Sequence, residues 1–319
     1  MTATPRLLLL VLALALPCLA VAEPASSPWR FSQVTGAGGV RLNVVQTGAP
    51  TGTPIVFVHG VGQSYLAFEP QLRGPLAARH PLVAYDLRGH GNSDKPLTRE
   101  AYADRQAWAD DLRAVIAATT SAPPLLVGWS YGTVVIVDYV RAHGTKQVAG
   151  IVLVSSDGGL SPPRPPMTGP IVEMLDAMHR RQEGPDLEGN VAAARELARL
   201  LTAKPMPEAW VERAALVSIR VPAPVWGLLR THPLANQDLV DRLDLPVMLA
   251  IGRHDGGTPE DATRAIARAM PDASVSVFEQ SGHSPFVEET ERFDAMLESF
   301  TQRLASRPKA GDVARQREK

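Results

Sequence analysis

The sequence predicts an α/β protein in which helices cover both faces of a mostly parallel sheet and a helical insertion interrupts the strand pattern. Short, almost continuous apolar runs alternate with helix-like stretches through the first half of the chain. Residues 158–244 then contain helical patterns without a strand-like run, and two further strand patterns follow. The chain has 319 residues, 45% of them hydrophobic, so it can bury a large core, and its net charge of −1 gives no reason to expect a nucleic-acid partner.

The first 22 residues predict a secretory signal peptide. Arg6 precedes an apolar stretch, and the small residues Ala20 and Ala22 form a cleavage signal. We therefore expect cleavage after Ala22, an exported protein in the periplasm or outside the cell, and no stable membrane insertion afterwards. A membrane anchor is the less favoured alternative, because Pro17 interrupts the apolar stretch before it reaches the roughly 20 residues that span a bilayer.

Cys18 is the only cysteine of the chain. After cleavage the protein would have none, which excludes disulfides, thiolate metal sites and a cysteine nucleophile. Lipid attachment at Cys18 is a second alternative to cleavage, although Pro17 stands where such sites usually have a small residue.

Residues 23–157 are predicted to form the first part of the core. The segments WRFSQV and VRLNVVQ have the pattern of half-exposed strands on either side of a glycine-rich turn at 36–39. The segments PIVFVHG, PLVAYDLRG, PLLVGWS and VAGIVLVSS are apolar enough for parallel strands buried on both faces. Helices are expected between them at 66–79, 99–118 and 132–142.

The insertion at 158–244 is expected to be a helical cap over the sheet. It begins with the loop LSPPRPPMTGP and continues with amphipathic stretches. Residues 245–305 complete the core with the strands LPVMLAIGRHD and ASVSVFEQ and with helices at 259–270 and 285–304. The charged segment 306–319 lacks an apolar face, so we expect a flexible tail.

A glycine-serine-glycine pattern, Gly128-Trp129-Ser130-Tyr131-Gly132, lies between a predicted strand and a predicted helix. In that context the pattern is typical of a nucleophile elbow, a sharp turn that exposes the serine hydroxyl. The turn brings the residues two before and two after the serine into contact, where a β-carbon does not fit. An ordinary turn is the alternative for this pattern.

A serine nucleophile requires a base, an acid that orients the base, and donors for the developing oxyanion. His283 follows the last predicted strand, and Asp255 follows the strand before it. The order serine, aspartate, histidine is the one expected of this arrangement. Asp157, after another apolar strand, is the alternative acid. The backbone N–H groups of Val61 and Tyr131 are the expected oxyanion donors.

With these pieces in order, the chain resembles the α/β-hydrolase family, closest to its serine esterase and cofactor-free haloperoxidase-like branch. The matching segments are HGVG, DLRGHGNSD, GWSYG, GRHD and SGHSPFVEE. The resemblance implies an eight-stranded sheet, Ser130 as nucleophile, His283 as general base and Asp255 as orienting acid. Thr133 departs from the family pattern, since many relatives have a further glycine there.

Other polar residues have simpler interpretations. Asp86 and His90 are expected to shape a turn, because Asp and Gly are turn formers. His59 is expected to brace a loop. No His, Asp or Glu cluster has metal-ligand spacing, and the glycine-rich segment at 36–39 is not followed by a helix, as a phosphate loop would be. We expect neither a metal nor an organic cofactor.

The sequence therefore predicts a carboxylic ester hydrolase that acts on small to medium, largely apolar esters. The alternatives are perhydrolysis, lactone opening or carbon-carbon bond hydrolysis on the same fold, or a binding protein that has lost turnover. The oligomeric state stays open. Substrate choice is assigned to an apolar pocket under the cap, since Met and aromatic side chains suit such pockets; the candidates are Trp129, Met167, Met174, Met178, Trp210 and Trp226.

Overall fold

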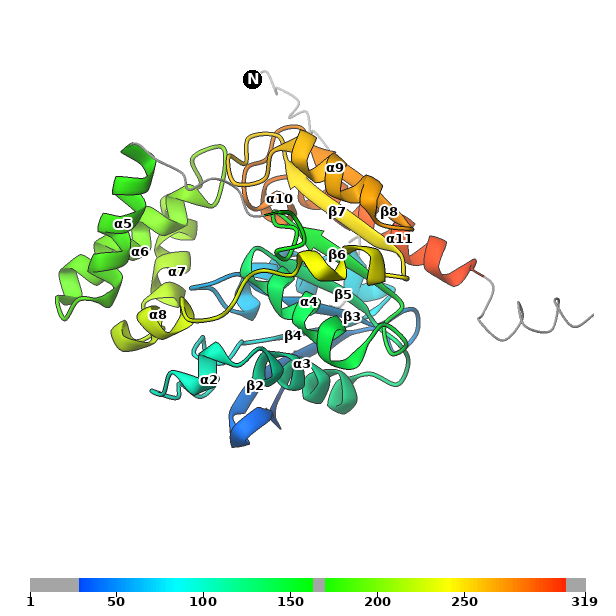
Figure 1. The fold of residues 1–319 in the computed structure, drawn as a ribbon, viewed down its shortest axis with the longest axis horizontal. Coiled ribbons are helices and arrows are strands. Elements are labelled where there is room, and N and C mark those ends of the chain that lie inside the picture. The colour runs from blue at the N-terminus through cyan, green and yellow to red at the C-terminus, as the bar shows by residue number, and fades with distance from the viewer. Residues whose placement is uncertain (1–28, 163–169, 308–319) are drawn as a thin grey trace, which may run out of the picture.

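The protein is described by a computed structural model that covers residues 29–162 and 170–307 (Figure 1). Its described residues contain an eight-stranded sheet in the order β1-β2-β4-β3-β5-β6-β7-β8. β1 and β2 pair antiparallel, as do β2 and β4, and every other neighbouring pair is parallel. The predicted class is confirmed. The strands are β1 (Arg30–Thr35), β2 (Arg41–Gly48), β3 (Ile55–Val58), β4 (Pro81–Tyr85), β5 (Leu125–Trp129), β6 (Gly150–Val154), β7 (Val247–Gly252) and β8 (Ala273–Phe278).

Burial along the sheet follows the apolar runs. Every residue of β3, β5 and β6 is buried, whereas β1 at the edge is almost wholly exposed. The central strands can be apolar throughout because helices cover both faces of the sheet. One face packs against α3 (Arg105–Thr119), α4 (Tyr131–His143) and α9 (Glu260–Ala269). The other packs against α1 (Glu69–Arg73), α10 (Pro285–Glu288) and α11 (Thr290–Ala305).

Three of the expected helices are broken into shorter pieces. The segment expected as one helix at 66–79 consists of a 3-10 turn at Tyr65–Phe68, α1, and a second 3-10 turn at Pro75–Ala78. Gly74 is extended, as the residue before a proline tends to be, and this ends α1. The segment at 99–118 divides into α2 (Glu100–Ala103) and α3, because the Asp104 carboxylate caps the second helix. The last segment divides into α10 and α11 at Glu289.

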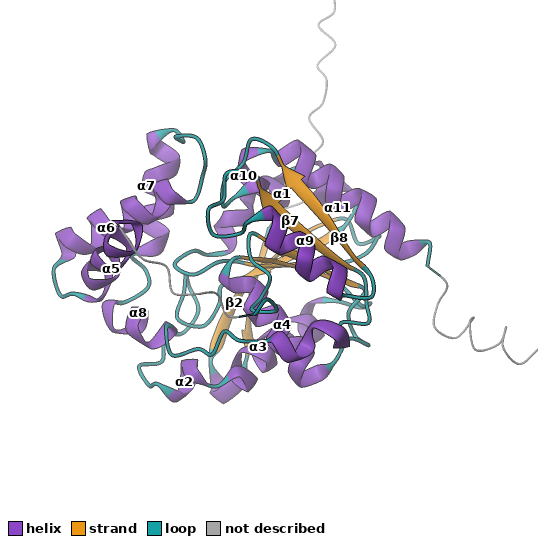
Figure 2. Ribbon diagram, turned by 45° about the horizontal axis from the view of Figure 1, so that its top comes forward, coloured by secondary structure: helices purple, strands orange, loops and turns teal. Residues whose placement is uncertain are grey.

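The described part of the insertion predicted at 158–244, which we call the cap, contains four α-helices. They are α5 (Pro170–Glu183), α6 (Leu187–Leu200), α7 (Glu208–Ser218) and α8 (Ala223–Leu229), and a 3-10 segment at Gln237–Arg242 follows. The described part of the insertion contains no strand. Figure 1 and Figure 2 show these helices as a group beside the sheet. Arg220 of the cap donates hydrogen bonds to the core, to the carbonyl oxygen of Gly91 and to the side chain of Asn92.

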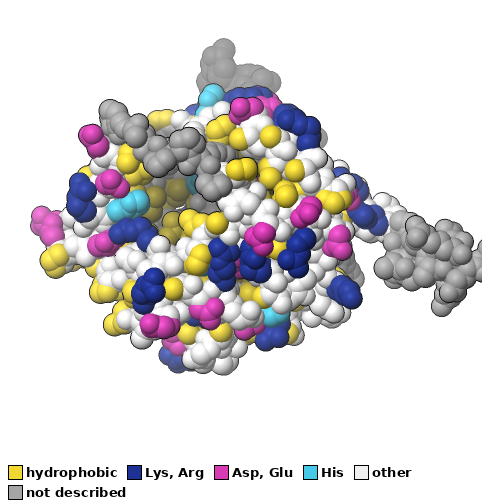
Figure 3. All heavy atoms as spheres, in the orientation of Figure 1, with side chains coloured by type: hydrophobic (Ala, Val, Ile, Leu, Met, Phe, Trp, Pro, Cys, Tyr) yellow, Lys and Arg dark blue, Asp and Glu magenta, His cyan; other side chains and the backbone are white. Residues whose placement is uncertain are grey.

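Two further properties bear on partners. Figure 3 shows acidic and basic side chains interspersed over the face in view. Within 29–162 and 170–307, no helix combines the length and apolar character needed to cross a membrane. The predicted signal peptide and tail (306–319) lie outside the described residues, apart from residues 306 and 307.

Candidate active site

Ser130 occupies a strained turn between β5 and α4. Its φ of 53° and ψ of −118° are unusual for a residue with a side chain. A β-carbon on Gly128 would lie 2.8 Å from the carbonyl oxygen of Gly132, and one on Gly132 would lie 2.1 Å from that of Val58. Only glycine fits at both positions, so the structure has the sharp elbow that the spacing predicted.

Thr133 stands at the position where the resemblance led us to expect a further glycine. Its side chain is fully buried, and its hydroxyl donates a hydrogen bond of 2.6 Å to the carbonyl oxygen of Ser130. The Thr133 N–H also donates to that oxygen, at 3.0 Å. Threonine in place of the expected glycine therefore adds a local hydrogen bond to the elbow.

His283 and Asp255 lie together at the ends of neighbouring strands. The Nδ1 atom of His283 is 2.9 Å from Oδ2 of Asp255. A carboxylate can only accept, so Nδ1 carries the proton. Nε2 of the neutral ring then has a lone pair that can accept another proton. Burial would raise the pKa of Asp255, but the hydrogen bond and charge of His283, with donors from Thr258 and Gly257, outweigh burial and lower it. The acid is held ionised beside the imidazole.

Asp157, the alternative acid, has a different partner. Its Oδ1 accepts a hydrogen bond of 2.9 Å from the N–H of Gly159, in the turn after β6. His283 Nδ1 donates its hydrogen bond to Asp255 instead. The geometry favours Asp255 as the orienting acid.

A cavity of about 330 Å³ contains both Ser130 and His283 in its wall. Its polar lining includes Ser155, Asp157 and Thr258. Leu249 and Ile251 supply part of the apolar wall. The cavity is therefore of mixed polarity rather than purely apolar.

The residues expected to line the substrate pocket are not among those that line the cavity containing Ser130. Trp129 and Trp210 line a neighbouring, mainly apolar cavity between cap and core. Trp226 packs against Gly62, where its ring would lie 2.5 Å from an added β-carbon. Met178 is only 2% exposed, whereas Met174 is 37% exposed. Met167 lies outside the described residues.

The loop after β3 runs directly past Ser130. A β-carbon on Gly60 would lie 3.1 Å from Cβ of Ser130. The N–H of Val61 in this loop and the N–H of Tyr131, the first residue of α4, donate to no acceptor within the described residues. The first N–H groups of a helix have no partner inside it, and they favour negative charge. In the described part of the chain, both predicted donors are therefore free of an acceptor of their own.

His59, Asp86 and His90 hold the surrounding loops. His59 Nδ1 donates to Gly60 O at 2.7 Å, and its Nε2 accepts from the N–H of Leu87 at 3.0 Å. Burial lowers the pKa of His59 to about 4 and that of His90 to about 3, so both rings are neutral at physiological pH. The Asp86 carboxylate accepts three hydrogen bonds from surrounding loops and β2. These are the bracing roles that the sequence predicted.

Two supporting contacts had no signal in the sequence. The indole N–H of Trp129 donates a 2.7 Å hydrogen bond to the carbonyl oxygen of His283. The Thr258 hydroxyl donates to the Asp255 carboxylate. Both contacts depend on how the strand ends meet. The described ranges contain no group of three or more His, Cys, Asp or Glu side chains that could hold a metal.

Comparisons with known proteins agree with this architecture. The model of the alpha/beta hydrolase family matches residues 55–296. The structure of the esterase RhEst1 from Rhodococcus sp. ECU1013 is 30% identical, with a TM-score of 0.75 over 86% of this chain and 99% of the other. The pimeloyl-[acyl-carrier protein] methyl ester esterase of Neisseria meningitidis serogroup B is 28% identical over 78% of this chain and 92% of its own length.

The non-heme chloroperoxidase CPO-A1 of Kitasatospora aureofaciens is 27% identical over 73% of this chain and 85% of its own length. Esterases and a haloperoxidase are thus both among the relatives, as the resemblance implied. The family model covers more than half of the sequence, from β3 to the middle of α11. The chain belongs to the alpha/beta hydrolase family.

Proposed function

We propose that this protein is an exported serine hydrolase that cleaves carboxylic esters through an acyl-enzyme formed on Ser130. One observation carries the proposal. Ser130, at the elbow, shares a cavity with His283, and His283 is hydrogen-bonded to Asp255. The esterases among the relatives support ester hydrolysis as the reaction.

In the first step, Ser130 Oγ attacks the ester carbonyl while His283 Nε2 takes the hydroxyl proton. The tetrahedral intermediate collapses, and the proton on Nε2 passes to the leaving alcohol. Asp255 holds the imidazole in the tautomer with the proton on Nδ1 and stabilises the imidazolium that forms. The lowered pKa of Asp255 suits this role, because the acid must keep its negative charge.

In the second step, water attacks the acyl-enzyme, and His283 again takes a proton and returns it to Ser130. In both steps the carbonyl oxygen becomes an oxyanion, which the N–H groups of Val61 and Tyr131 would bind. Loss of one such donor typically costs about 3 to 4 kcal/mol of transition-state stabilisation. An aspartate nucleophile, used by some proteins of this fold, is excluded by the serine at position 130.

The substrate class is narrowed by the cavity beside Ser130. Its volume of about 330 Å³ suits an ester of small to medium size. The serine and threonine side chains in its wall would accept some polarity in the acyl or alcohol group. We therefore propose small to medium esters that are not purely apolar.

A fluorophosphonate probe tests the nucleophile. We expect covalent labelling that maps to Ser130 by peptide mass spectrometry. We also expect no labelling of Ser130→Ala, and losses of several orders of magnitude in p-nitrophenyl acetate turnover for Ser130→Ala and His283→Ala. Heat-denatured protein is the control for nonspecific labelling. Folded wild-type protein that neither reacts with the probe nor hydrolyses the ester would contradict the proposal.

Export is tested separately. Protein expressed with its complete sequence in a Gram-negative host should be recovered from the periplasm or medium with Glu23 as its first residue. An unprocessed or lipid-modified amino terminus would contradict cleavage after Ala22.

A further inference from the structure

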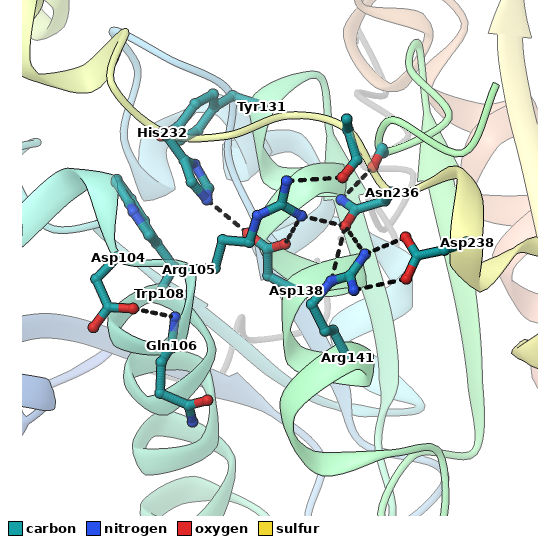
Figure 4. Close-up of polar contacts among 12 residues, drawn as sticks. Asp104, Arg105, Gln106, Trp108, Tyr131, Asp138, Arg141, His232, Asn236 and Asp238 are labelled. Atoms are coloured by element: carbon teal, nitrogen blue, oxygen red, sulfur yellow. Dashed lines mark hydrogen bonds and ion pairs between the residues drawn. The ribbon is translucent and has the colours of Figure 1, made fainter. Parts of the chain in front are cut away.

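A second histidine, His232, is hydrogen-bonded to the side chain of the residue that follows the nucleophile. The hydroxyl of Tyr131 lies 2.7 Å from Nδ1 of His232, and Nε2 of His232 lies 2.6 Å from Oδ2 of Asp138 (Figure 4). The His232 and Asp138 side chains are both fully buried. These three side chains form what we call the elbow clamp.

Each hydrogen bond of the elbow clamp has one donor and one acceptor. Because a carboxylate accepts, Nε2 of His232 donates to Asp138, and in the neutral ring Nδ1 accepts from the Tyr131 hydroxyl. Burial, together with the negative charge of Asp138, raises the pKa of Tyr131 well above its usual value, so this hydroxyl stays protonated. Each ring nitrogen thus has one partner, as a buried polar group requires.

Aromatic packing holds the imidazole in place. The Trp108 ring stacks on His232 with centroids 4.9 Å apart and an interplanar angle of 13°. The same Trp108 ring meets Tyr131 edge-on at 5.3 Å. The position of the Tyr131 side chain is therefore determined by packing as well as by the hydrogen bond.

The elbow clamp joins the start of α4 to the cap. Tyr131 and Asp138 lie seven residues apart on α4, which is two helical turns, so they share a face. His232 lies in the segment 230–238, which follows the last described cap helix, α8, and which we call the return segment. The clamp therefore ties this return segment to the helix that begins beside the nucleophile.

Neighbouring contacts hold the same return segment to α3 and α4. Arg105 donates to Asp138 at 3.3 Å and to the carbonyl oxygen of Ala235 at 2.8 Å. Arg141 donates to the Asn236 side chain at 2.9 Å and to Asp238 at 2.8 Å. Figure 4 shows both arginines reaching this segment from the two helices. The hydrogen bonds that Arg141 makes within the described residues go to the return segment and to none of the three clamp side chains, which makes Arg141 a useful control.

We propose that Tyr131, His232 and Asp138 are positioning residues that hold the Tyr131 N–H in place as an oxyanion donor. The peptide between Ser130 and Tyr131 belongs to a strained turn, and a strained conformation persists only where its surroundings hold it. The clamp fixes the side chain of Tyr131, the residue that supplies the N–H of that peptide. The inference rests on the proposed function, since the oxyanion is the charge to be stabilised.

Tyr131→Phe tests the clamp, because it removes only the hydroxyl. We expect kcat for p-nitrophenyl acetate to fall about tenfold with little change in KM, since a displaced donor should cost less than a deleted one. Inhibition by a trifluoromethyl ketone, which places an oxyanion in the same position on Ser130, should weaken by a similar factor. Asp138→Asn should show the same split between kcat and KM.

The control is Arg141→Gln, which loosens the return segment from α4 without removing a hydrogen bond of the clamp. It should lower the melting temperature while leaving kcat and ketone inhibition near wild type. The clamp would be merely structural if Tyr131→Phe kept wild-type kcat and ketone affinity, or if Arg141→Gln lost as much of either. If circular dichroism shows Tyr131→Phe to be unfolded, Asp138→Asn decides by the same measurements.

Failure of the clamp differs from failure of the proposed function. Wild-type protein without turnover, labelling or ketone binding would contradict the function itself. An active wild type whose clamp variants behave like it would contradict the clamp alone.

Discussion

Asp255 and His283 lie 28 residues apart in the sequence, yet their side chains meet at 2.9 Å. The reason is the pairing of β7 with β8, which run parallel with Gly252 opposite Phe278. The two residues follow the carboxyl ends of these strands, at the same edge of the sheet. Sites in open α/β sheets form at this edge.

The first prediction concerns the orienting acid. Asp255→Asn should lower kcat for p-nitrophenyl acetate by about 10⁴-fold, because the amide would favour the wrong imidazole tautomer. Asp157→Asn is the matched comparison, since Asp157 lines the same cavity but bonds Gly159. A much larger loss in Asp157→Asn than in Asp255→Asn would show that the acid is misassigned.

The second prediction concerns Trp129. Trp129→Phe keeps an aromatic ring but removes the hydrogen bond to the carbonyl oxygen of His283. A hydrogen bond of this kind contributes roughly 0.5 to 1.5 kcal/mol, so we expect kcat/KM to fall between about twofold and tenfold. Trp210→Phe, in the same neighbouring cavity, is the comparison. Equal losses in the two variants would mean that ring volume matters and the hydrogen bond does not.

The third prediction concerns the elbow glycine. Gly132→Ala should destabilise the fold by several kcal/mol, because its β-carbon would collide with the main-chain carbonyl of Val58, which cannot swing aside as a flexible side chain could. The control is Gly227→Ala in α8, where the nearest atom is 3.8 Å away and helix propensity should add roughly 0.5 to 1 kcal/mol. Urea unfolding measures both. A Gly132→Ala variant of wild-type stability would be incompatible with the elbow geometry.

The fourth prediction concerns Asp294 on α11. Burial raises its pKa to about 6, although Gln71 donates a hydrogen bond to it. Between about pH 4 and pH 6, the folded state therefore keeps a proton on Asp294 that the unfolded state has already released. Stability from this group is present below that window and is lost as the pH rises through it.

Asp294→Asn should remove this loss. We expect it to stabilise the protein at pH 8 by at most about 3 kcal/mol, from two pKa units, with a smaller gain at pH 5. Melting temperatures at the two pH values measure the difference. Glu298→Gln is the control on the same helix. Burial by itself would raise the pKa of Glu298, but the hydrogen bonds from Arg79 and His80 outweigh burial and lower this pKa below its usual value. A gain for Asp294→Asn that did not depend on pH would rule out titration as its cause.

The short apolar runs determined much of the fold. A strand covered on both faces must be apolar throughout, so the central strands could be predicted from composition and length alone. The breaks in the helices were harder to predict. At Gly74 and Asp104 a short-range preference interrupts an amphipathic pattern that would otherwise continue, and periodicity alone does not show which of the two prevails.

The sequence by itself determined the elbow, because Gly128 and Gly132 are required by contacts within a few residues of Ser130, and it determined the order of serine, acid and base. Only the tertiary structure decided which aspartate meets His283, since that depends on which strand ends are neighbours. It also decided the lining of the cavity and the elbow clamp. His232 contacts Tyr131 from 101 residues away, and the path of the chain through the cap brings it there.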